Sequence, residues 1–304
     1  MTGMIENELL ARHTSWRIGG PARYYQEART TEQLQDALAW AQAHNIPTFV
    51  LGSGTNVLAL DNGFSGLVIR YTAREWEVRT RGEQPVLYVE AGAPVAGTVR
   101  RIATHGWGGL TWAEGLPGSF GGAVYGNAGC YGGDMARVLE RAWLLVGPQV
   151  ELWTPERLAF DYRTSAVKQW DAANGPRPIV LAAELCIHEA NPSELAATMA
   201  RIAAERKSKT PWGRSCGSVF KNPPPTADGT RWSAGQLIDR AGLKGTRIGG
   251  AEISTVHGNY IVNREDASAA DVLNLIDMAR RTVQDEFGIT LELEVQLLGD
   301  IECK

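Results

Sequence analysis

The sequence predicts an α+β protein in which many short strands are combined with a few longer helices. Apolar residues recur at helical spacing between residues 268 and 287, and they alternate with polar residues in the final segment, 289–297. Short apolar runs separated by glycine and proline fill much of the remaining chain. With 304 residues, the chain is long enough for two domains or for one large domain.

Two helices and six short strands are expected in the first 190 residues. Thr30 opens a capping box for a helix that runs to about Ala43. Pro94 is expected at the first position of a second helix, which ends near His105. Short apolar runs predict the strands, at 47–51, 67–71, 86–90, 143–146, 150–153 and 179–187.

Two further helices are expected in the C-terminal part. Asn191 caps a helix over 193–207, and a domain boundary is predicted just before it. Ser268 caps a long helix over 269–287, and Gly288 is placed to end it. The apolar positions of the long helix fall on one face, which is therefore expected to lie in the core.

The last predicted strand, 289–297, presents two glutamates on its polar face. Ile289 and Leu291 begin the apolar face, whereas Glu292 and Glu294 share the opposite one. A glutamate on the polar face of a strand is most often simply solvated. Spacing alone does not decide which of the two, if either, carries chemistry.

Charge and composition argue against a nucleic-acid-binding protein. The net charge is −4 and the pI is about 5.8, so the chain lacks the basic character that nucleic acid requires. Its few basic clusters, such as Arg206–Lys209, suit one anionic small molecule better than a polyanion.

No membrane segment or metal site is expected. No apolar run approaches the roughly 20 residues that span a bilayer, and the first ten residues lack the apolar core of a secretory signal. We therefore expect a cytoplasmic protein. The four cysteines, Cys130, Cys186, Cys216 and Cys303, lie far apart and form no C-x-x-C pair, which argues against disulfides and against zinc.

Residues 106–133, the glycine-rich run, contain eleven glycines in 28 residues. Glycine permits positive φ and close approach of the backbone to a ligand, and the exposed N–H groups can cradle a pyrophosphate. The run has neither a Walker loop nor the dinucleotide fingerprint. A flexible surface loop is the alternative, but the interspersed Leu116, Phe120, Val124 and Tyr125 favour packed backbone.

Three other segments contain residues suited to chemistry. Arg163 offers a planar fork for a carboxylate, although many such arginines simply lie at the surface. Ser218, with Lys221 close behind it, suits a proton donor in a cramped polar site; a plain turn is the alternative, and the absence of a G-x-S-x-G elbow weakens an esterase interpretation. Cations and glycines also combine in 243–251, and His257 is expected to be structural.

Together these segments resemble the UDP-N-acetylenolpyruvoylglucosamine reductases, flavoenzymes of bacterial peptidoglycan precursor synthesis. The matching segments are short but ordered along nearly the whole chain: 14–22, 51–56, 115–123, 127–129, 162–163, 217–223, 234–239, 242–245, 248–251 and 293–295. The resemblance implies an FAD-binding domain of the vanillyl-alcohol-oxidase type over 1–190, with two subdomains (roughly 1–72 and 73–190). A substrate-binding domain would follow over 191–304.

The resemblance also implies non-covalently bound FAD, with NADPH as co-substrate. Two glycine-rich segments would lie along the pyrophosphate and ribityl chain of FAD. The implied cofactor-binding residues are Gly52, Ser53, Gly54, Thr55, Asn56, Gly115, Pro117, Gly118, Ser119, Gly121, Gly122, Asn127 and Gly129.

The implied reaction adds a hydride to an enolpyruvyl group and then a proton to its α-carbon. Arg163 would clamp the substrate carboxylate and polarise the enol ether, and Glu294, selected over Glu292 by the match, would hold the enolate-like intermediate. Ser218 would then protonate the α-carbon. The partner is a UDP-sugar, and the residues implied to hold it are Tyr162, Lys209, Asn222 and Lys244.

The chain resembles the shorter subgroup of this family, since it lacks the inserted tyrosine-bearing loop, and Cys216 is assigned no role. One alternative is another flavin oxidoreductase on the same fold, such as a sugar or alcohol oxidase, which would turn over with oxygen and without NADPH. A second is a non-catalytic flavin- or nucleotide-sugar-binding module, which would bind FAD and turn nothing over.

Overall fold

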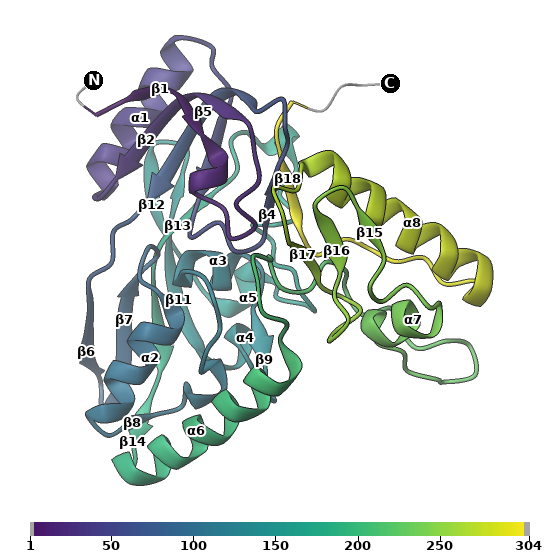
Figure 1. Cartoon of the computed structure of the whole chain (residues 1–304). Helices are drawn as coiled ribbons and strands as arrows, with labels where there is room; N and C mark the ends of the chain where they lie inside the picture. Colours follow the sequence, from purple (N-terminus) through teal and green to yellow (C-terminus); the bar gives the residue numbers. More distant parts are fainter. Residues whose placement is uncertain (1–2, 301–304) are drawn as a thin grey trace.

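The first sheet of the computed structural model, which describes residues 3–300, lies in the N-terminal part (Figure 1). It contains β1 (Ile5–Leu9), β2 (Pro21–Ala28), β3 (Thr48–Leu51) and β5 (Phe64–Tyr71). The strand order is β1-β2-β5-β3, with β2, β5 and β3 parallel and β1 antiparallel to β2. A helix, α1 (Thr31–Ala43), connects β2 to β3, as parallel strands require.

A second, antiparallel sheet follows. It contains β6 (Trp76–Arg81), β7 (Gln84–Glu90), β11 (Leu139–Val146), β12 (Gln149–Trp153) and β13 (Ile179–Cys186). The strand order is β12-β11-β13-β7-β6. Two helices from the long β7–β11 connection, α2 (Val95–Thr104) and α3 (Phe120–Tyr125), lie beside this sheet, and α3 contacts β13 directly (Figure 1).

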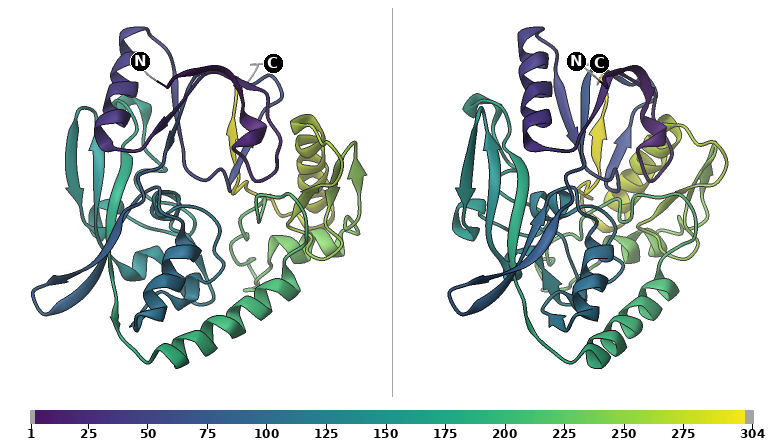
Figure 2. Two further views of the ribbon diagram at one scale, coloured as in Figure 1. Left: turned by 60° about the vertical axis from the view of Figure 1, so that its left-hand side comes forward. Right: turned by 90° about the vertical axis from the view of Figure 1, so that its left-hand side faces the viewer.

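The C-terminal part is smaller. Its sheet is formed by β15 (Arg247–Ile248), β16 (Ala251–Ile253) and β17 (Ile261–Asn263), and α8 (Ala269–Phe287) packs against β15 and β16. Ahead of them come α6 (Pro192–Lys209) and α7 (Ala234–Arg240). Figure 2 shows α6 running along the base of the molecule, from the second sheet to the C-terminal part.

The remaining elements are short. They are η1 (Leu10–Arg12), β4 (Val57–Ala59), β8 (Trp107–Gly108), η2 (Thr111–Ala113), β9 (Gly129–Cys130), β10 (Gly133–Asp134), α4 (Met135–Val138), α5 (Pro155–Leu158), η3 (Ala172–Asn174), β14 (His188–Glu189) and β18 (Gln296–Leu298).

Several contacts tie the N- and C-terminal parts together. β18, near the end of the chain, pairs in parallel with β4, so that Gln296 lies opposite Val57. The indole of Trp16 donates to Ile261 O at 2.7 Å, and Asn263 Nδ2 donates to Trp16 O at 2.9 Å. Trp16 is buried in the same apolar cluster as α8. The chain therefore returns to its N-terminal part after forming the C-terminal sheet.

Most predicted elements are confirmed. Thr30 caps α1, Asn191 caps α6, and Ser268 forms a reciprocal capping box with Asp271 at the start of α8. Gly288 ends α8 in the left-handed region, with a φ of 67°. The six predicted strands are all present, several of them longer than expected. The glycine-rich run is packed backbone that contains α3.

Three predictions of local structure are wrong in detail. Pro94 is the residue before the first turn of α2. Gln33 accepts from Arg29 N, so the capping box at Thr30 is one-sided. The last strand covers only 296–298. Burial alternates as predicted over residues 289–292, but Leu293 and Glu294 are both partly buried. The segment opposite them offers a single bridge, Phe220 with Leu293, before Pro223 removes the next donor.

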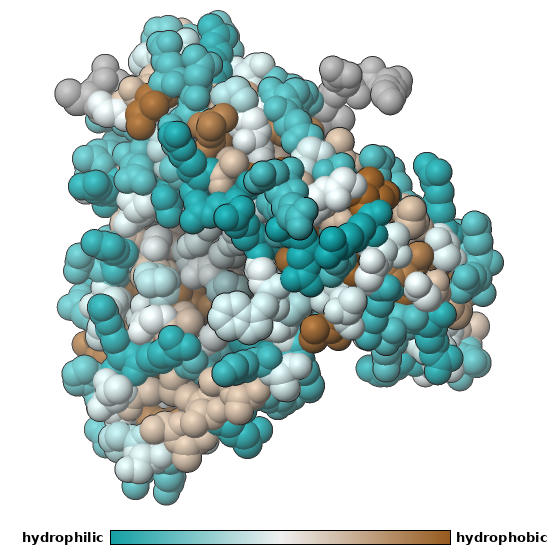
Figure 3. Space-filling view, in the orientation of Figure 1, coloured by the Kyte–Doolittle hydropathy of each residue, from teal (hydrophilic) through white to brown (hydrophobic). Residues whose placement is uncertain are grey.

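The helix α6, at which the second domain is predicted to begin, buries Leu195 and Met199 in the core of the first domain. The predicted domain limits stay a prediction. Their outer ends, at residues 1 and 304, and Cys303 lie outside the described residues. The face shown in Figure 3 is largely hydrophilic, with single hydrophobic residues scattered over it and a weakly apolar area near α6. No helix within residues 3–300 is both long and apolar enough to cross a membrane.

Candidate active site

Two of the predicted catalytic residues, from distant parts of the chain, form an ion pair. Arg163 Nε lies 3.1 Å from Glu294 Oε1, although its N–H does not point at that oxygen. The third, Ser218, immediately precedes Val219, whose carbonyl accepts a hydrogen bond from Glu294 N at 2.8 Å. The folded chain therefore brings the segments that carry all three together.

Arg163 occupies a strained tight turn, residues 161–164, here called the arginine turn. Asp161 and Thr164 exchange backbone hydrogen bonds of 3.3 and 3.2 Å across it. Arg163 has a φ of 55°, in the left-handed region that non-glycine residues rarely adopt. Asn127 Nδ2 holds the turn through Asp161 O at 2.9 Å. A strained backbone conformation persists only where surrounding contacts hold it, and such conformations are common at functional sites.

The structure distinguishes the two glutamates that spacing left equivalent. The Glu294 side chain is 17% exposed, whereas that of Glu292 is 71% exposed and pairs with Lys221. Burial raises the pKa of Glu294, and the positive charges of Arg163, Lys168 and Lys221 oppose this rise. A carboxyl in this setting can hold a proton or accept strong hydrogen bonds, which suits a group that faces developing negative charge.

The segment that carries Ser218 is clamped by Asn259, for which the sequence predicts no such role. Phe220 N donates to Asn259 Oδ1 at 2.9 Å, and Asn259 Nδ2 donates to Phe220 O at 2.8 Å. Val219 N also donates to Asn259 O at 2.9 Å. The Asn259 residue is only 4% exposed. An asparagine ahead of a strand carries no sequence signal for this contact, because its partner lies in another segment.

Replacing Asn259 by alanine is expected to lower the free energy of unfolding by about 2–4 kcal/mol, because two buried backbone groups of Phe220 lose their partners. Urea unfolding of the purified variant measures this loss. Asn174→Ala, at an exposed position in η3, is the matched control and is expected to change stability by less than about 0.5 kcal/mol. Equal midpoints for both variants would refute the clamp.

The two predicted cofactor segments face each other closely. A Cβ added to Gly52 would lie 2.7 Å from Ser119 Oγ, and one added to Gly118 would lie 2.9 Å from Thr55 Oγ1. Side chains at these two glycines would fill the space between residues 52–56 and 115–119, which we call the cradle. A nearby carboxylate, that of Glu114, is buried and held by Arg100 Nε at 2.9 and 3.0 Å, which fixes the start of the second segment.

Several buried donors around the glycine-rich run lack hydrogen-bond partners among the described residues. They are Trp112 Nε1, Arg206 Nε and Arg163 Nε. Arg206 lies against Gly115, where an added Cβ would be 2.9 Å from its Cδ, and its Nη2 donates to Cys130 Sγ at 3.3 Å. Unsatisfied buried donors are uncommon in native proteins, and here they fit the acceptor oxygens and nitrogens of a bound cofactor.

Other predicted cofactor residues pack within the protein. Added Cβ atoms at Gly54, Gly121 and Gly129 would collide with His13, Ala91 and Asp134, respectively. Asn56 Nδ2 donates to Glu294 O at 3.1 Å, which ties the cradle to the candidate site. The Asn127 side chain bonds within the protein: Nδ2 donates to Asp161 O, and Oδ1 accepts from Ala136 N. All of the cofactor assignments, including those of Ser53, Pro117 and Gly122, stay predictions.

The predicted substrate residues do not all lie together. Tyr162 is half-exposed beside the site, and its hydroxyl accepts from Asn222 N at 3.3 Å. Lys209 pairs with Glu205 at the end of α6, and Lys244 pairs with Asp239 after α7. No contact among residues 3–300 joins either lysine to Arg163 or Glu294, and all four substrate assignments stay predictions.

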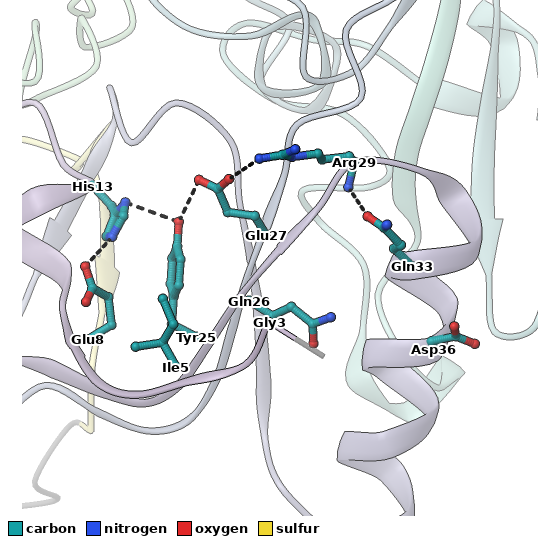
Figure 4. Close-up of a pocket in the computed structure, with 10 residues that line it drawn as sticks. All are labelled: Gly3, Ile5, Glu8, His13, Tyr25, Gln26, Glu27, Arg29, Gln33 and Asp36. Atoms are coloured by element: carbon teal, nitrogen blue, oxygen red, sulfur yellow. Dashed lines mark hydrogen bonds and ion pairs between the residues drawn. The ribbon is translucent and has the colours of Figure 1, made fainter. Parts of the chain in front are cut away.

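The cavity in Figure 4 lies elsewhere, beside the first sheet, and has a volume of about 640 Å³. A chain of polar contacts runs along it, from Glu8 to His13 at 2.9 Å and from His13 to the Tyr25 hydroxyl at 3.2 Å. Burial raises the pKa of Tyr25 to about 12. None of the predicted site residues lines this cavity. In residues 3–300, no group of three or more His, Cys, Asp and Glu side chains is placed to hold a metal ion.

The chain is similar to reductases of one kind along nearly its whole length. The UDP-N-acetylenolpyruvoylglucosamine reductase C-terminal domain model matches residues 207–298, and an FAD binding domain model matches residues 22–144. A UDP-N-acetylenolpyruvoylglucosamine reductase from Chloroflexus aggregans is 53% identical over 96% of each chain, and one from Chloroflexus aurantiacus is 52% identical over 97% of each chain.

A solved structure is similar as well. The crystal structure of UDP-N-acetylenolpyruvylglucosamine reductase from Thermus caldophilus is 35% identical in sequence and has a TM-score of 0.79, covering 97% of this chain and 98% of that chain. These matches confirm the predicted fold class, an α+β FAD-binding domain followed by a second α+β domain.

Proposed function

The chain belongs to the UDP-N-acetylenolpyruvoylglucosamine reductase family, and from this premise we propose that it reduces UDP-N-acetylglucosamine enolpyruvate to UDP-N-acetylmuramate with NADPH. It is an FAD-dependent oxidoreductase of peptidoglycan precursor synthesis, which we place in the cytoplasm. The observation that carries the proposal is the Arg163–Glu294 pair, in which a buried carboxyl lies beside the Ser218 segment.

The residues of the cradle fit FAD. Gly52 and Gly118 keep open a space that a side chain would close, which lets a phosphate-bearing ligand approach the backbone. The unpaired donors of Trp112 and Arg206 lie along the glycine-rich run. When bound, FAD supplies the hydride chemistry that couples oxidation of NADPH to reduction of the enolpyruvyl double bond. The residues of the chain then orient the substrate, stabilise the negative charge that develops on it and deliver a proton to its α-carbon.

Arg163 and Glu294 are proposed to stabilise the negative charge that hydride addition produces. Hydride addition to the methylene carbon leaves negative charge on the α-carbon and its carboxylate. The Arg163 guanidinium can hold that carboxylate in a bidentate manner, while the Glu294 carboxyl, protonated or strongly hydrogen-bonded, holds the enolate-like oxygen. Both side chains are partly buried, at 25% and 17% exposure, so these interactions are stronger than in water.

Ser218 is proposed to deliver the proton. A proton added to the α-carbon completes the lactyl ether, and the serine hydroxyl is the candidate donor. An unassisted hydroxyl is a weak acid, so the donor needs a well-fixed position. Asn259 supplies that fixation through the backbone of the two residues that follow Ser218.

The test is to purify the protein, record its flavin spectrum, and follow NADPH absorbance after addition of the enolpyruvyl UDP-sugar. Substrate-dependent oxidation of NADPH, with a product heavier by two hydrogens, is the expected result. UDP-N-acetylglucosamine, which lacks the enolpyruvyl group, is the control and should support no turnover. A flavin spectrum without turnover would indicate a binding module, and oxygen-dependent turnover of a simple alcohol would indicate an oxidase.

Gly118→Ala is expected to lower the fraction of purified protein that carries FAD, because the added methyl group would lie 2.9 Å from Thr55 Oγ1 inside the cradle. The ratio of flavin to protein absorbance measures this fraction. Gly132→Ala is the matched control, since Gly132 also has positive φ but nothing within 4 Å of its added Cβ. Both variants carry backbone strain of about 1–3 kcal/mol. A loss of bound flavin in Gly118→Ala but not in Gly132→Ala would therefore show that the added methyl group acts through the cradle and not through strain.

A further inference from the structure

The ammonium group of Lys168 folds back onto the arginine turn. Lys168 Nζ donates to Arg163 O at 2.9 Å. That carbonyl belongs to the residue with a φ of 55°, so the bond acts directly on the strained peptide unit. A hydrogen bond from a charged donor is about twice as strong as a neutral one. Lys168 is therefore placed to hold Arg163 in its unusual conformation.

Lys168 is itself fixed to the glycine-rich run. Its backbone N donates to Ser165 Oγ at 3.2 Å, and Ser165 Oγ donates to Tyr125 O at 2.7 Å. Ser165 and Val167, which both precede Lys168 in the chain, are fully buried. Tyr125 is the last residue of α3, the helix inside the glycine-rich run. The lysine thus links the glycine-rich run to Arg163 through fixed neighbours.

The charge of Lys168 also reaches the candidate catalytic carboxylate. Three positive groups, Arg163, Lys168 and Lys221, lower the pKa of Glu294 against the effect of burial. The Tyr260 hydroxyl lies near enough that the charge of Glu294 helps to raise its pKa. Lys221 is already paired with the Glu292 carboxylate, with 2.5 Å between Nζ and Oε1. The Lys168 ammonium bonds to a neutral carbonyl, so its charge is left for Glu294 and for any anion beside it.

We propose that Lys168 is a positioning residue for the reaction, which locks the arginine turn and places a further positive charge beside the carboxylate site. The effect of Lys168 on the reaction rests on the proposed function, whereas its contacts with the arginine turn are present in the protein without substrate. Burial lowers the pKa of Lys168, so this positive charge is lost at a lower pH than in a lysine exposed to water.

The kinetic test compares Lys168→Met, Lys168→Arg and Lys168→Gln in the FAD-loaded enzyme. We expect Lys168→Met to slow oxidation of the reduced flavin by substrate about ten- to a hundredfold, the typical worth of a hydrogen bond to a charged group. Arginine keeps both donor and charge and should recover most of the rate. Glutamine keeps a donor alone and should fall between them. Lys207→Met, at an exposed position in α6, is the control and should match the wild type.

A second readout does not depend on turnover. Carboxyl ¹³C NMR of glutamate-labelled protein follows the pKa of Glu294, whose signal is identified by its loss in Glu294→Gln. Removal of the Lys168 charge should raise that pKa in Lys168→Met and Lys168→Gln but not in Lys168→Arg. A lysine that merely supports the fold would change the unfolding midpoint and leave this pKa in place.

The outcomes separate the two proposals. Wild-type kinetics together with an unchanged Glu294 pKa in Lys168→Gln and Lys168→Met would overturn the role of Lys168. If the wild type itself fails to reduce the enolpyruvyl UDP-sugar, the proposed function is wrong, yet a raised Glu294 pKa in the uncharged variants would still support the positioning of this site by Lys168.

Discussion

Ser218→Ala leaves reduction of the bound flavin by NADPH nearly unchanged and slows its reoxidation by the enolpyruvyl substrate about 10²–10⁴-fold, which is the expected result if Ser218 is the general acid. Hydride addition to the double bond requires a proton at the α-carbon, and the alanine variant has no donor at that position. The backbone contacts of Val219 and Phe220 to Asn259 do not involve the Ser218 side chain, so the segment should keep its place.

Stopped-flow absorbance measures the two half-reactions separately. Ser215→Ala, three residues upstream in the same segment, is the matched control and should reoxidise at the wild-type rate. Ser218→Cys retains an acidic hydrogen, since a thiol has a pKa of roughly 8.5, and should recover part of the rate. Reoxidation of Ser218→Ala at the wild-type rate would remove Ser218 from this role.

Glu294→Gln should slow the same half-reaction about 10²–10³-fold, in the range seen when one preorganised donor to a developing anion is removed. The amide is similar in shape to the carboxyl but is a weaker donor and has no acidic proton. Glu292→Gln is the matched control, because Glu292 lies two residues away on the same segment and is largely exposed. Equal losses in both variants would contradict the assignment to Glu294.

The same variant should change how stability depends on pH. Because burial raises the pKa of Glu294, the folded protein binds more protons than the unfolded chain between the ordinary glutamate value and the raised one. Wild-type stability therefore falls as pH rises through that window, where the buried carboxylate becomes charged. Glutamine does not titrate, so this part of the decline should be missing when free energies of unfolding are compared across pH.

The sequence predicted elements well wherever the deciding signals were local. The ends of α8 follow from Ser268 and Gly288, and its buried face follows from its apolar spacing. The final strand was predicted too long because alternation reports burial and not the presence of a hydrogen-bonding partner. Leu291 and Val295 are buried as predicted, yet the segment opposite them supplies only one bridge.

The candidate site was predictable as a set of residues but not as an arrangement. Arg163, Ser218 and Glu294 were found through the family resemblance. The choice of Glu294 over Glu292 depends on burial against the arginine turn, which spacing cannot reveal. Asn259 and Lys168 were missed because each acts on a backbone group that only folding brings within reach.

The pairing of β18 with β4 sets an order of events during synthesis. Glu294 and β18 lie at the end of the described chain, whereas the cradle and β4 leave the ribosome early. A nascent chain can therefore form both N-terminal sheets while β4 still lacks its neighbour and while Trp16 and Leu58 still lack the apolar cluster that covers them. Pairing of strands that lie far apart in the sequence is slow, and the apolar surface that it buries stays exposed to water until it occurs. Catalytic competence would then arrive last, in a single step after translation has passed residue 298, and a polypeptide released before that point would lack the candidate catalytic glutamate or its anchoring strand.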